Sequence, residues 1–185
     1  MARIKGTGVL SSVLYFKDQW GEAGLEKIKA ACTGAARDML ARPVLPVVWY
    51  PDQAMIDMLL VADKVCGRGD KNVLRAIGRF DAERNLRGVY KMFISLTSPH
   101  FLIKNAARVW RQFFDEGDVE TRHFEETSGV LVVRNFSDMP LYHEVNQMPF
   151  MERALEMCGC RNVRGAHLAC LARGDDRCEF RYTWE

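Results

Sequence analysis

The C-terminal segment HLACLARGDDRCEFRYTWE constrains the fold of this chain more than any other segment. In it Cys178, Phe180 and Tyr182 alternate with polar residues, which is the period of a β-strand with one buried face. Gly174 and Asp175, which precede this strand, are typical of a turn between antiparallel strands. We therefore expect the chain to end in an antiparallel hairpin.

The register of this hairpin decides where two of the six cysteines lie. A three-residue loop centred on Gly174 places Cys170 opposite Cys178, with β-carbons ~5 Å apart, so that both thiolates can bind one metal ion. A two-residue loop formed by Gly174 and Asp175 instead turns the cysteines to opposite faces of the sheet. His167 becomes a third ligand if its strand contains a bulge, because straight alternation turns positions three apart to opposite faces.

The fourth ligand of such a site is open. His143 or Glu144 precedes the last helix, and Cys158 or Cys160 lies near its end. The alternative is that the cysteines are packed thiols, because free cysteine is among the most buried residue types. The metal site that we predict, with zinc as its ion, consists of Cys170, Cys178, His167 and His143.

The first two-thirds of the chain has helical periodicity. Apolar residues recur near the helical period over 9–16 and 25–32, and further helices are expected within 71–114 and over about 142–158. The segment 118–136 predicts another hairpin. The sequence predicts an α+β fold, with helices packed on one side of a four- to five-stranded antiparallel sheet, in a single domain of residues 1–185. Its helical part spans about 9–116, and hairpin, helix and hairpin follow over about 118–185.

One predicted helix, from Pro51 to Cys66, is apolar around most of its circumference. Such a helix needs cover on every side, either inside the core or in a subunit interface. The sequence leaves both alternatives open, and the second predicts a homodimer.

Composition and charge exclude some classes of protein. The 185 residues include 48% hydrophobic and 27% charged residues, a balance typical of globular proteins. The net charge of +2 disfavours a surface built for nucleic acid, although a basic stripe with Lys71, Arg75 and Arg79 keeps a local acidic partner open. Ser11 and Ser12 interrupt the apolar N-terminal stretch, so we expect no signal peptide. We expect no membrane span and a cytoplasmic location, where cysteines stay reduced.

No catalytic motif is present in the sequence. The glycines at Gly6 and Gly8 lack the third glycine of a dinucleotide site, and GRGDK lacks the spacing of a phosphate loop, so we expect no nucleotide. HEVNQ has Gln147 where a zinc protease needs a second histidine. We therefore expect a protein that is not an enzyme.

Several motifs support a family resemblance over nearly the whole chain. The pattern RNV, HxxC and ARGDDRCEF resembles the C-terminus of 4-vinyl reductase domains. WYP at 49–51, LRGVYKMF at 86–93, SPHFLIKNAARVW at 98–110 and FFDEGDVE at 113–120 resemble a related paralogous family expanded in myxobacteria. The resemblance implies kinship with the haem-nitric-oxide-binding and TRAPP-component superfamily. It also implies helices over an antiparallel sheet, frequent dimerisation and a buried pocket for a small molecule or lipid tail.

The resemblance also bears on cofactors. Phenol-sensing relatives bind zinc with an upstream cysteine, a glutamate three residues before a second cysteine, and a third cysteine eight residues further. Cys170 and Cys178 match the last two positions, His167 replaces the glutamate, and His143 lies in the region of the first. The YxSxR motif of the haem-binding relatives is missing from the sequence, so we expect no haem.

These observations predict a non-enzymatic sensory or ligand-binding domain whose pocket lies between the apolar helices and the sheet. A hydrophobic small molecule is the expected ligand. The alternative is a homodimeric interaction module of TRAPP-component type that recruits a protein partner without a ligand. The residues that we expect to line the pocket are Met55, Met58, Leu59, Phe93, Phe101, Leu102 and Trp110.

Overall fold

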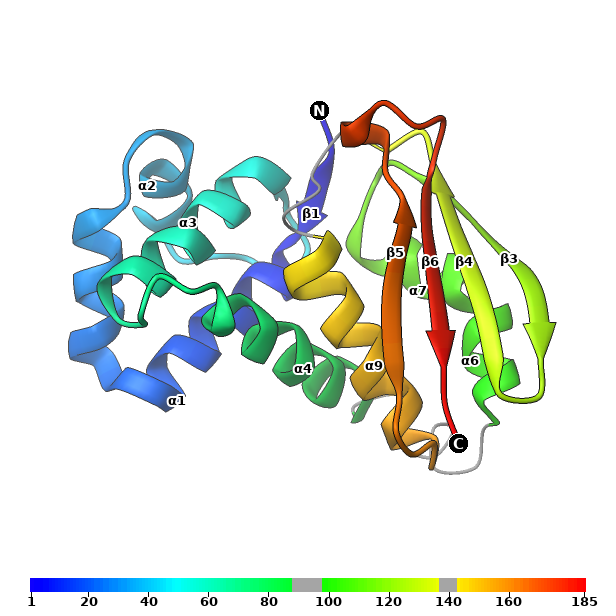
Figure 1. The fold of residues 1–185 in the computed structure, drawn as a ribbon. Helices are drawn as coiled ribbons and strands as arrows, with labels where there is room; N and C mark the ends of the chain where they lie inside the picture. Colours follow the sequence, from blue (N-terminus) through cyan, green and yellow to red (C-terminus); the bar gives the residue numbers. More distant parts are fainter. Residues whose placement is uncertain (88–97, 137–142) are drawn as a thin grey trace.

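A four-stranded antiparallel sheet forms one half of the molecule (Figure 1). The computed structural model describes residues 1–87, 98–136 and 143–185. The strand order in the sheet is β3-β4-β6-β5, so that the C-terminal strand β6 pairs with both β4 and β5. The strands are β3 (Asp118–Glu125), β4 (Ser128–Arg134), β5 (Arg164–Ala169) and β6 (Cys178–Thr183).

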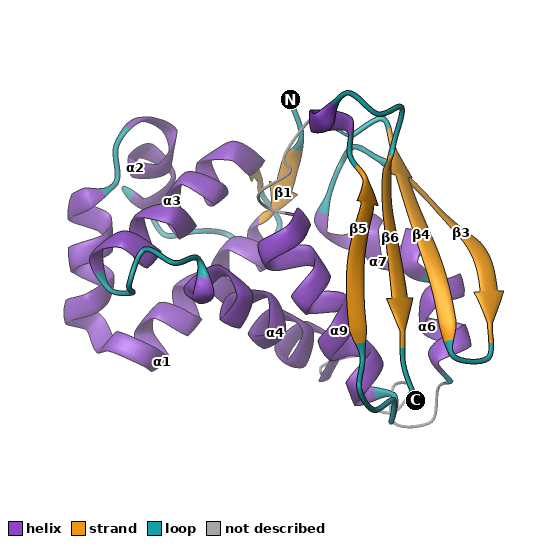
Figure 2. Cartoon of the chain, viewed as in Figure 1, coloured by secondary structure: helices purple, strands orange, loops and turns teal. Residues whose placement is uncertain are grey.

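The helices lie on one side of this sheet, as the sequence predicted (Figure 2). Three of them pack near its inner face, and α4 connects this layer to the N-terminal helices. The helices near the sheet are α6 (Pro99–Lys104), α7 (Ala106–Phe113) and α9 (Met148–Met157), the last preceded by a π-helical turn, η1 (His143–Gln147). The remaining elements are β1 (Arg3–Lys5), α1 (Gly6–Ala31), α2 (Gly34–Leu40), β2 (Trp49–Pro51), α3 (Asp52–Val65), α4 (Asn72–Arg87) and the 3₁₀ turn η2 (Leu171–Arg173).

The two faces of the sheet differ in chemistry. On β6, Phe180 and Tyr182 are buried towards the helices, whereas Arg181 between them is exposed, as the alternation predicted. On the outer face, the carboxylate of Glu120 pairs with Arg122 and Arg134 on the neighbouring strand positions. The inner face therefore supplies the apolar wall of the interior.

The first helix departs from the sequence prediction of two separate helices. Residues 6–31 form one helical run, α1, with a break at Gly21, whose φ of 66° and ψ of −172° are not helical. Glycine adopts this conformation readily because it has no β-carbon. The two predicted segments are therefore the two arms of one kinked helix.

The apolar helix α3 is covered within the chain itself. Met55, Met58 and Leu59 are fully buried, and α3 packs against α1, α2 and α4. Burial on these sides explains why so much of the circumference of this helix is apolar. The apolar character of α3 therefore does not require a second subunit.

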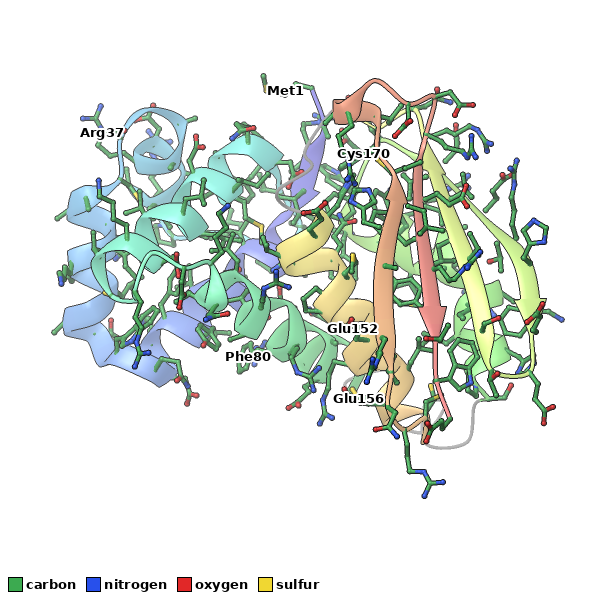
Figure 3. The ribbon with its side chains drawn as sticks, viewed as in Figure 1. Met1, Arg37, Phe80, Glu152, Glu156 and Cys170 are labelled. Carbon is green, nitrogen blue, oxygen red and sulfur yellow. The ribbon has the colours of Figure 1, made fainter. Side chains whose placement is uncertain are left out.

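The basic stripe on α4 is partly used inside the molecule. The guanidinium of Arg79 donates two hydrogen bonds to the carboxylate of Glu156 on α9, at 3.2 and 2.7 Å (Figure 3). Arg75 donates to the backbone carbonyl of Glu144 at 3.4 Å. These contacts hold α4 against the segment that carries η1 and α9.

Close packing of α4 against η1 depends on one glycine. A β-carbon at Gly78 would lie 2.2 Å from the backbone oxygen of Asn146. Helix propensity alone predicts that Gly78→Ala stabilises the protein by about 1 kcal/mol. We expect the opposite, a loss of about 2–3 kcal/mol and a Tm about 5–10 °C lower, because the backbones must separate. Thermal unfolding of the variant measures the sign, and a higher Tm would show that α4 and η1 are not in such close contact.

In the part of the chain that the structure describes, no helix combines the length and apolarity that a membrane crossing requires.

Candidate functional site

The end of β5 and the start of β6 form a local structure that turns a histidine and two cysteines to the same side of the sheet. A bulge interrupts the pairing of β5 with β6 between His167 and Ala169. The turn η2 follows and ends at Gly174, whose φ of 91° suits a residue without a β-carbon. The carboxylate of Asp175 accepts a hydrogen bond of 2.6 Å from the backbone N–H of Cys170 and closes this connection. The connection between the cysteines is therefore a 3₁₀ turn, and both sulfurs lie on the inner side of the sheet.

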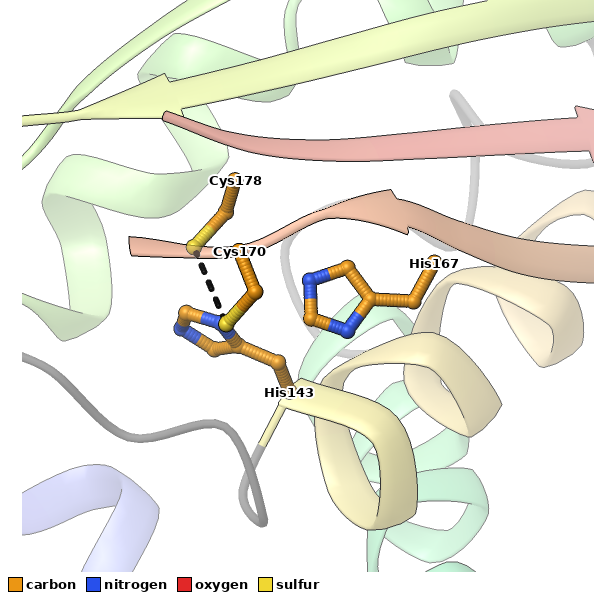
Figure 4. Close-up of side chains that lie close together, drawn as sticks. All are labelled: His143, His167, Cys170 and Cys178. Atoms are coloured by element: carbon orange, nitrogen blue, oxygen red, sulfur yellow. Dashed lines mark hydrogen bonds between the residues drawn. The ribbon is translucent and has the colours of Figure 1, made fainter. Parts of the chain in front are cut away.

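Four side chains that can bind a metal come together there (Figure 4). His143 on η1 reaches across to His167 on β5 and to Cys170 and Cys178 on either side of the turn. One ligand atom from each of the four lies within 4.8 Å of every other. The structure thus places the four residues of the predicted metal set in one cluster, which we call the His/Cys cluster.

The spacing within the His/Cys cluster suits a tetrahedral ion. The sulfur atoms of Cys170 and Cys178 are 3.9 Å apart. Two thiolates that bind one zinc ion at about 2.3 Å in tetrahedral geometry are separated by about 3.8 Å. Two cysteines and two histidines form one of the common ligand sets of structural zinc sites.

The histidines of the cluster are held in the neutral form that binds metals. Burial lowers the pKa of His143 to about 3, and the neighbouring His167 lowers it further. Burial also lowers the pKa of His167, in spite of the nearby Glu144 carboxylate. Neither ring nitrogen of His143 has a hydrogen-bond partner, and Nε2 of His167 has none, although these atoms are buried. A metal ion would satisfy buried nitrogens that otherwise cost free energy.

The other nitrogen of His167 is fixed by a carboxylate. Nδ1 of His167 lies 3.1 Å from Oε1 of Glu144, which also contacts Arg173 at 3.3 Å. A carboxylate behind a histidine ligand orients the ring and leaves Nε2 for the metal. Glu144 is therefore placed behind the ligands and does not belong to the four-residue group.

Glu144→Gln tests this arrangement. We expect its affinity for zinc to fall about 10- to 100-fold with little change in secondary structure, because the ring of His167 loses its orienting carboxylate. Competition with a chromogenic chelator measures the affinity. Glu152→Gln, which changes a carboxylate on the neighbouring helix α9, serves as the control (Figure 3). Equal affinities of the two variants would show that Glu144 does not support the cluster.

The remaining candidates for metal ligands lie outside the His/Cys cluster. The group formed by the described residues includes neither Cys158 nor Cys160, the alternatives for the fourth ligand. Burial raises the pKa of the Cys160 thiol to about 11, so this side chain stays protonated. His100 packs against Phe124 with ring centroids 4.3 Å apart.

An apolar cavity of about 110 Å³ lies between the inner face of the sheet and the helices. Its polar lining residues, which the sequence analysis did not identify, are on α4 and η1. Its walls come from α4, α6, α7, η1, α9, β4 and β6, with contributions from the N-terminal segment and β3. The lining residues are Ile4, Gly8, Asp81, Asn85, Leu102, Ala106, Val109, Trp110, Phe113, Phe114, Val119, Leu131, Val133, Asn146, Gln147, Phe150, Met151, Phe180 and Tyr182.

The sequence prediction located only part of this cavity. Leu102 and Trp110 line it. The prediction is wrong for Met55, Met58 and Leu59, which are buried among the helices away from the cavity, because helical periodicity marks a core face without showing where packing is incomplete. It is also wrong for Phe101, which is 52% exposed. Phe93 lies outside the described residues.

One aromatic residue and one helical turn connect the cavity to the His/Cys cluster. Phe180 lines the cavity and stacks on His167 with ring centroids 4.5 Å apart. Its ring also meets His143 edge-to-face at 5.5 Å. The same turn, η1, carries His143 at its start and the cavity residue Gln147 at its end. A change at either place can therefore reach the other through direct contacts.

Comparison with known proteins gives a likeness of fold. No protein-family model matches the chain, and no curated protein matches it in sequence. The fold is similar to that of solved H-NOX proteins, which match with 98% of this chain covered. The H-NOX protein from K. algicida has 9% identity, a TM-score of 0.72 and 96% of its own chain covered. Its counterpart from S. oneidensis, in the Fe(II)NO ligation state, has 11%, 0.72 and 99%, and a T. tengcongensis variant has 10%, 0.70 and 97%.

These matches correct two expectations. The chain was expected to resemble 4-vinyl reductase domains, whereas the fold that it shares over nearly its whole length is that of H-NOX proteins. Short motifs around a cysteine hairpin do not distinguish related folds from one another, which explains the error. The expectation that haem is excluded is also wrong as an inference from the missing YxSxR motif, because proteins with this fold are studied for their haem.

The fit of a haem can be tested on the residues of the cavity. Haem iron in proteins takes an axial histidine, cysteine, methionine or tyrosine. The described lining residues include no histidine, cysteine, lysine or arginine. Tyr182 lines the cavity, but burial raises the pKa of its phenol and keeps it protonated. Met151 offers only a thioether, without a histidine on the opposite side among the described lining residues. The described cavity therefore does not fit a haem.

Proposed function

We propose that this protein is a non-enzymatic sensory domain in which the cavity binds a small molecule and the His/Cys cluster binds one zinc ion. The observation that carries the proposal is the convergence of four buried ligand side chains at the base of the final hairpin. Neutral imidazoles and closely spaced sulfurs supply the ligand chemistry that zinc prefers. The H-NOX-like fold supports the sensory part of the proposal.

The zinc ion would act as a structural clamp. When bound, it joins η1 to the hairpin of β5 and β6, two parts of the chain that are otherwise held by packing. His143 and Gln147 lie on the same turn, so the clamp also fixes one wall of the cavity. Binding in the cavity would then bias the position of η1, and η1 would transmit the change to α4.

Xenon binding tests the cavity. An engineered apolar cavity of about 150 Å³ binds benzene or xenon and stays dry, so a cavity of about 110 Å³ has room for xenon. We expect xenon to shift NMR resonances of methyl groups that line the cavity, such as those of Leu102 and Val133. Ala106→Leu, which adds three carbons inside the cavity, should remove this response. Ala35→Leu adds the same atoms at an exposed position on α2 and should preserve it. A wild-type protein without any response to xenon would contradict the cavity.

A further inference from the structure

The apolar cavity has a polar corner. Asp81 and Asn85 lie one helical turn apart on α4, and Gln147 ends the turn η1 that packs against α4. All three residues line the cavity. Because α4 and η1 are in direct contact, the three side chains lie on the same side of the cavity.

Each residue of this corner has a buried polar atom without a hydrogen-bond partner. These atoms are Oδ1 of Asp81, Nδ2 of Asn85 and Nε2 of Gln147. Asp81 itself is only 6% exposed. Buried polar groups in folded proteins are rarely left unpaired, because an unpaired group loses its hydrogen bonds to water without replacement. The corner therefore offers one acceptor and two amide donors to a molecule in the cavity.

A hydroxyl group matches this set of atoms. Its O–H donates to Oδ1 of Asp81, and its oxygen accepts from the amide groups of Asn85 and Gln147. The rest of the cavity is lined mainly by apolar side chains, including Leu102, Val133 and Phe180, which suit a hydrocarbon. The volume of about 110 Å³ limits the ligand to fewer atoms than benzene, whose known cavity is about 150 Å³.

From these observations we infer that the cavity binds a small aliphatic alcohol, with its hydroxyl in the corner formed by Asp81, Asn85 and Gln147. The inference rests on the proposed function, because it names the class of ligand for the same cavity. It adds that the cavity distinguishes an alcohol from a hydrocarbon of the same shape.

Isobutanol and isopentane are suitable probes, because they differ only by a hydroxyl group in place of a methyl group. We expect isobutanol to bind the full chain roughly tenfold more tightly than isopentane, measured by NMR titration of the cavity methyl groups. The larger hydration of isobutanol in water opposes its binding, so this preference requires hydrogen bonds in the corner.

Asp81→Leu tests the corner directly. The variant should lose the preference, so that isobutanol binds no more tightly than isopentane. The matched control is Asp52→Leu, because Asp52 is 1% exposed and has no hydrogen-bond partner for either carboxylate oxygen, but does not line the cavity. The control should keep the roughly tenfold preference. If Asp81→Leu does not fold, Asn85→Leu and Gln147→Leu replace it, and each should reduce the preference at least threefold.

The outcomes separate the inference from the proposed function. Xenon binding together with equal affinities for isobutanol and isopentane would overturn the inference and leave the cavity in place. A preference that persists in Asp81→Leu would also overturn it. A protein that binds none of the three probes would contradict both the inference and the proposed cavity.

Discussion

Replacing Cys170 with serine is expected to reduce bound zinc from about one equivalent to less than 0.2 equivalents per chain and to destabilise the protein. A serine hydroxyl is a poor zinc ligand, and loss of the ion releases η1 from the hairpin. We expect a loss of about 4 kcal/mol in the free energy of unfolding, which for a chain of this length lowers the Tm by about 10 °C. Elemental analysis and thermal unfolding measure the two effects.

Cys160→Ser provides the control for this prediction. Cys160 is also buried, at 8% exposure, but lies outside the His/Cys cluster. We expect this variant to keep its zinc, whatever its effect on packing. If Cys170→Ser and Cys160→Ser lose stability and zinc to the same extent, the cysteines act as packed thiols and the zinc site is wrong.

The second large effect is a loss of stability as the pH rises from 4 to 8. Burial raises the pKa of Asp52 to about 7, with a contribution from Asp115, and burial likewise raises the pKa of Asp81 to about 7. Between pH 4 and 7 the folded state therefore holds protons that the unfolded chain has released, so stability falls as the pH rises. The stabilisation is complete below about pH 4 and lost above about pH 7. A difference of about three pH units corresponds to about 4 kcal/mol for one carboxyl group.

Asp52→Asn isolates one of these groups. The neutral amide cannot ionise, so we expect the variant to be more stable than the wild type at pH 8 by about 2–4 kcal/mol and close to it at pH 4. Urea unfolding at both pH values gives the two differences. Asp57→Asn, at an exposed position on the same helix, should change stability by less than about 0.5 kcal/mol at either pH. A stability of Asp52→Asn that parallels the wild type from pH 4 to 8 would show that Asp52 ionises freely in the folded protein.

The final hairpin is the part that sequence reasoning predicted best. Alternation at Cys178, Phe180 and Tyr182 fixed the buried face of β6, and the spacing around Gly174 allowed both cysteines to share one face. The bulge beside His167 could be stated only as a condition. A bulge depends on the pairing of two strands and on the contact of His167 with Glu144, which no local pattern shows.

The cavity could not be predicted in the same way. Met55 and Leu102 have the same apolar character and helical spacing, yet one is packed in the core and the other lines the cavity. The difference arises because α1, α2 and α4 cover α3, whereas space remains between the sheet and its helices. Asp81 was considered only as an acidic residue in a basic stretch. Its burial and its missing partner appear only when α4 packs against the rest of the fold.

Homodimerisation stays a prediction. Its main support was the apolar circumference of α3, and this helix is buried among α1, α2 and α4 of the same chain. Sedimentation of the full chain at micromolar concentration would decide between monomer and dimer.

X-ray absorption at the zinc edge tests the central claim most directly, using the full chain purified without added zinc. The account predicts about one zinc per chain, with two sulfur ligands at about 2.3 Å and two nitrogen ligands at about 2.0 Å. Less than half an equivalent of zinc, or a first shell without sulfur, would contradict the assignment of His143, His167, Cys170 and Cys178 as a metal site.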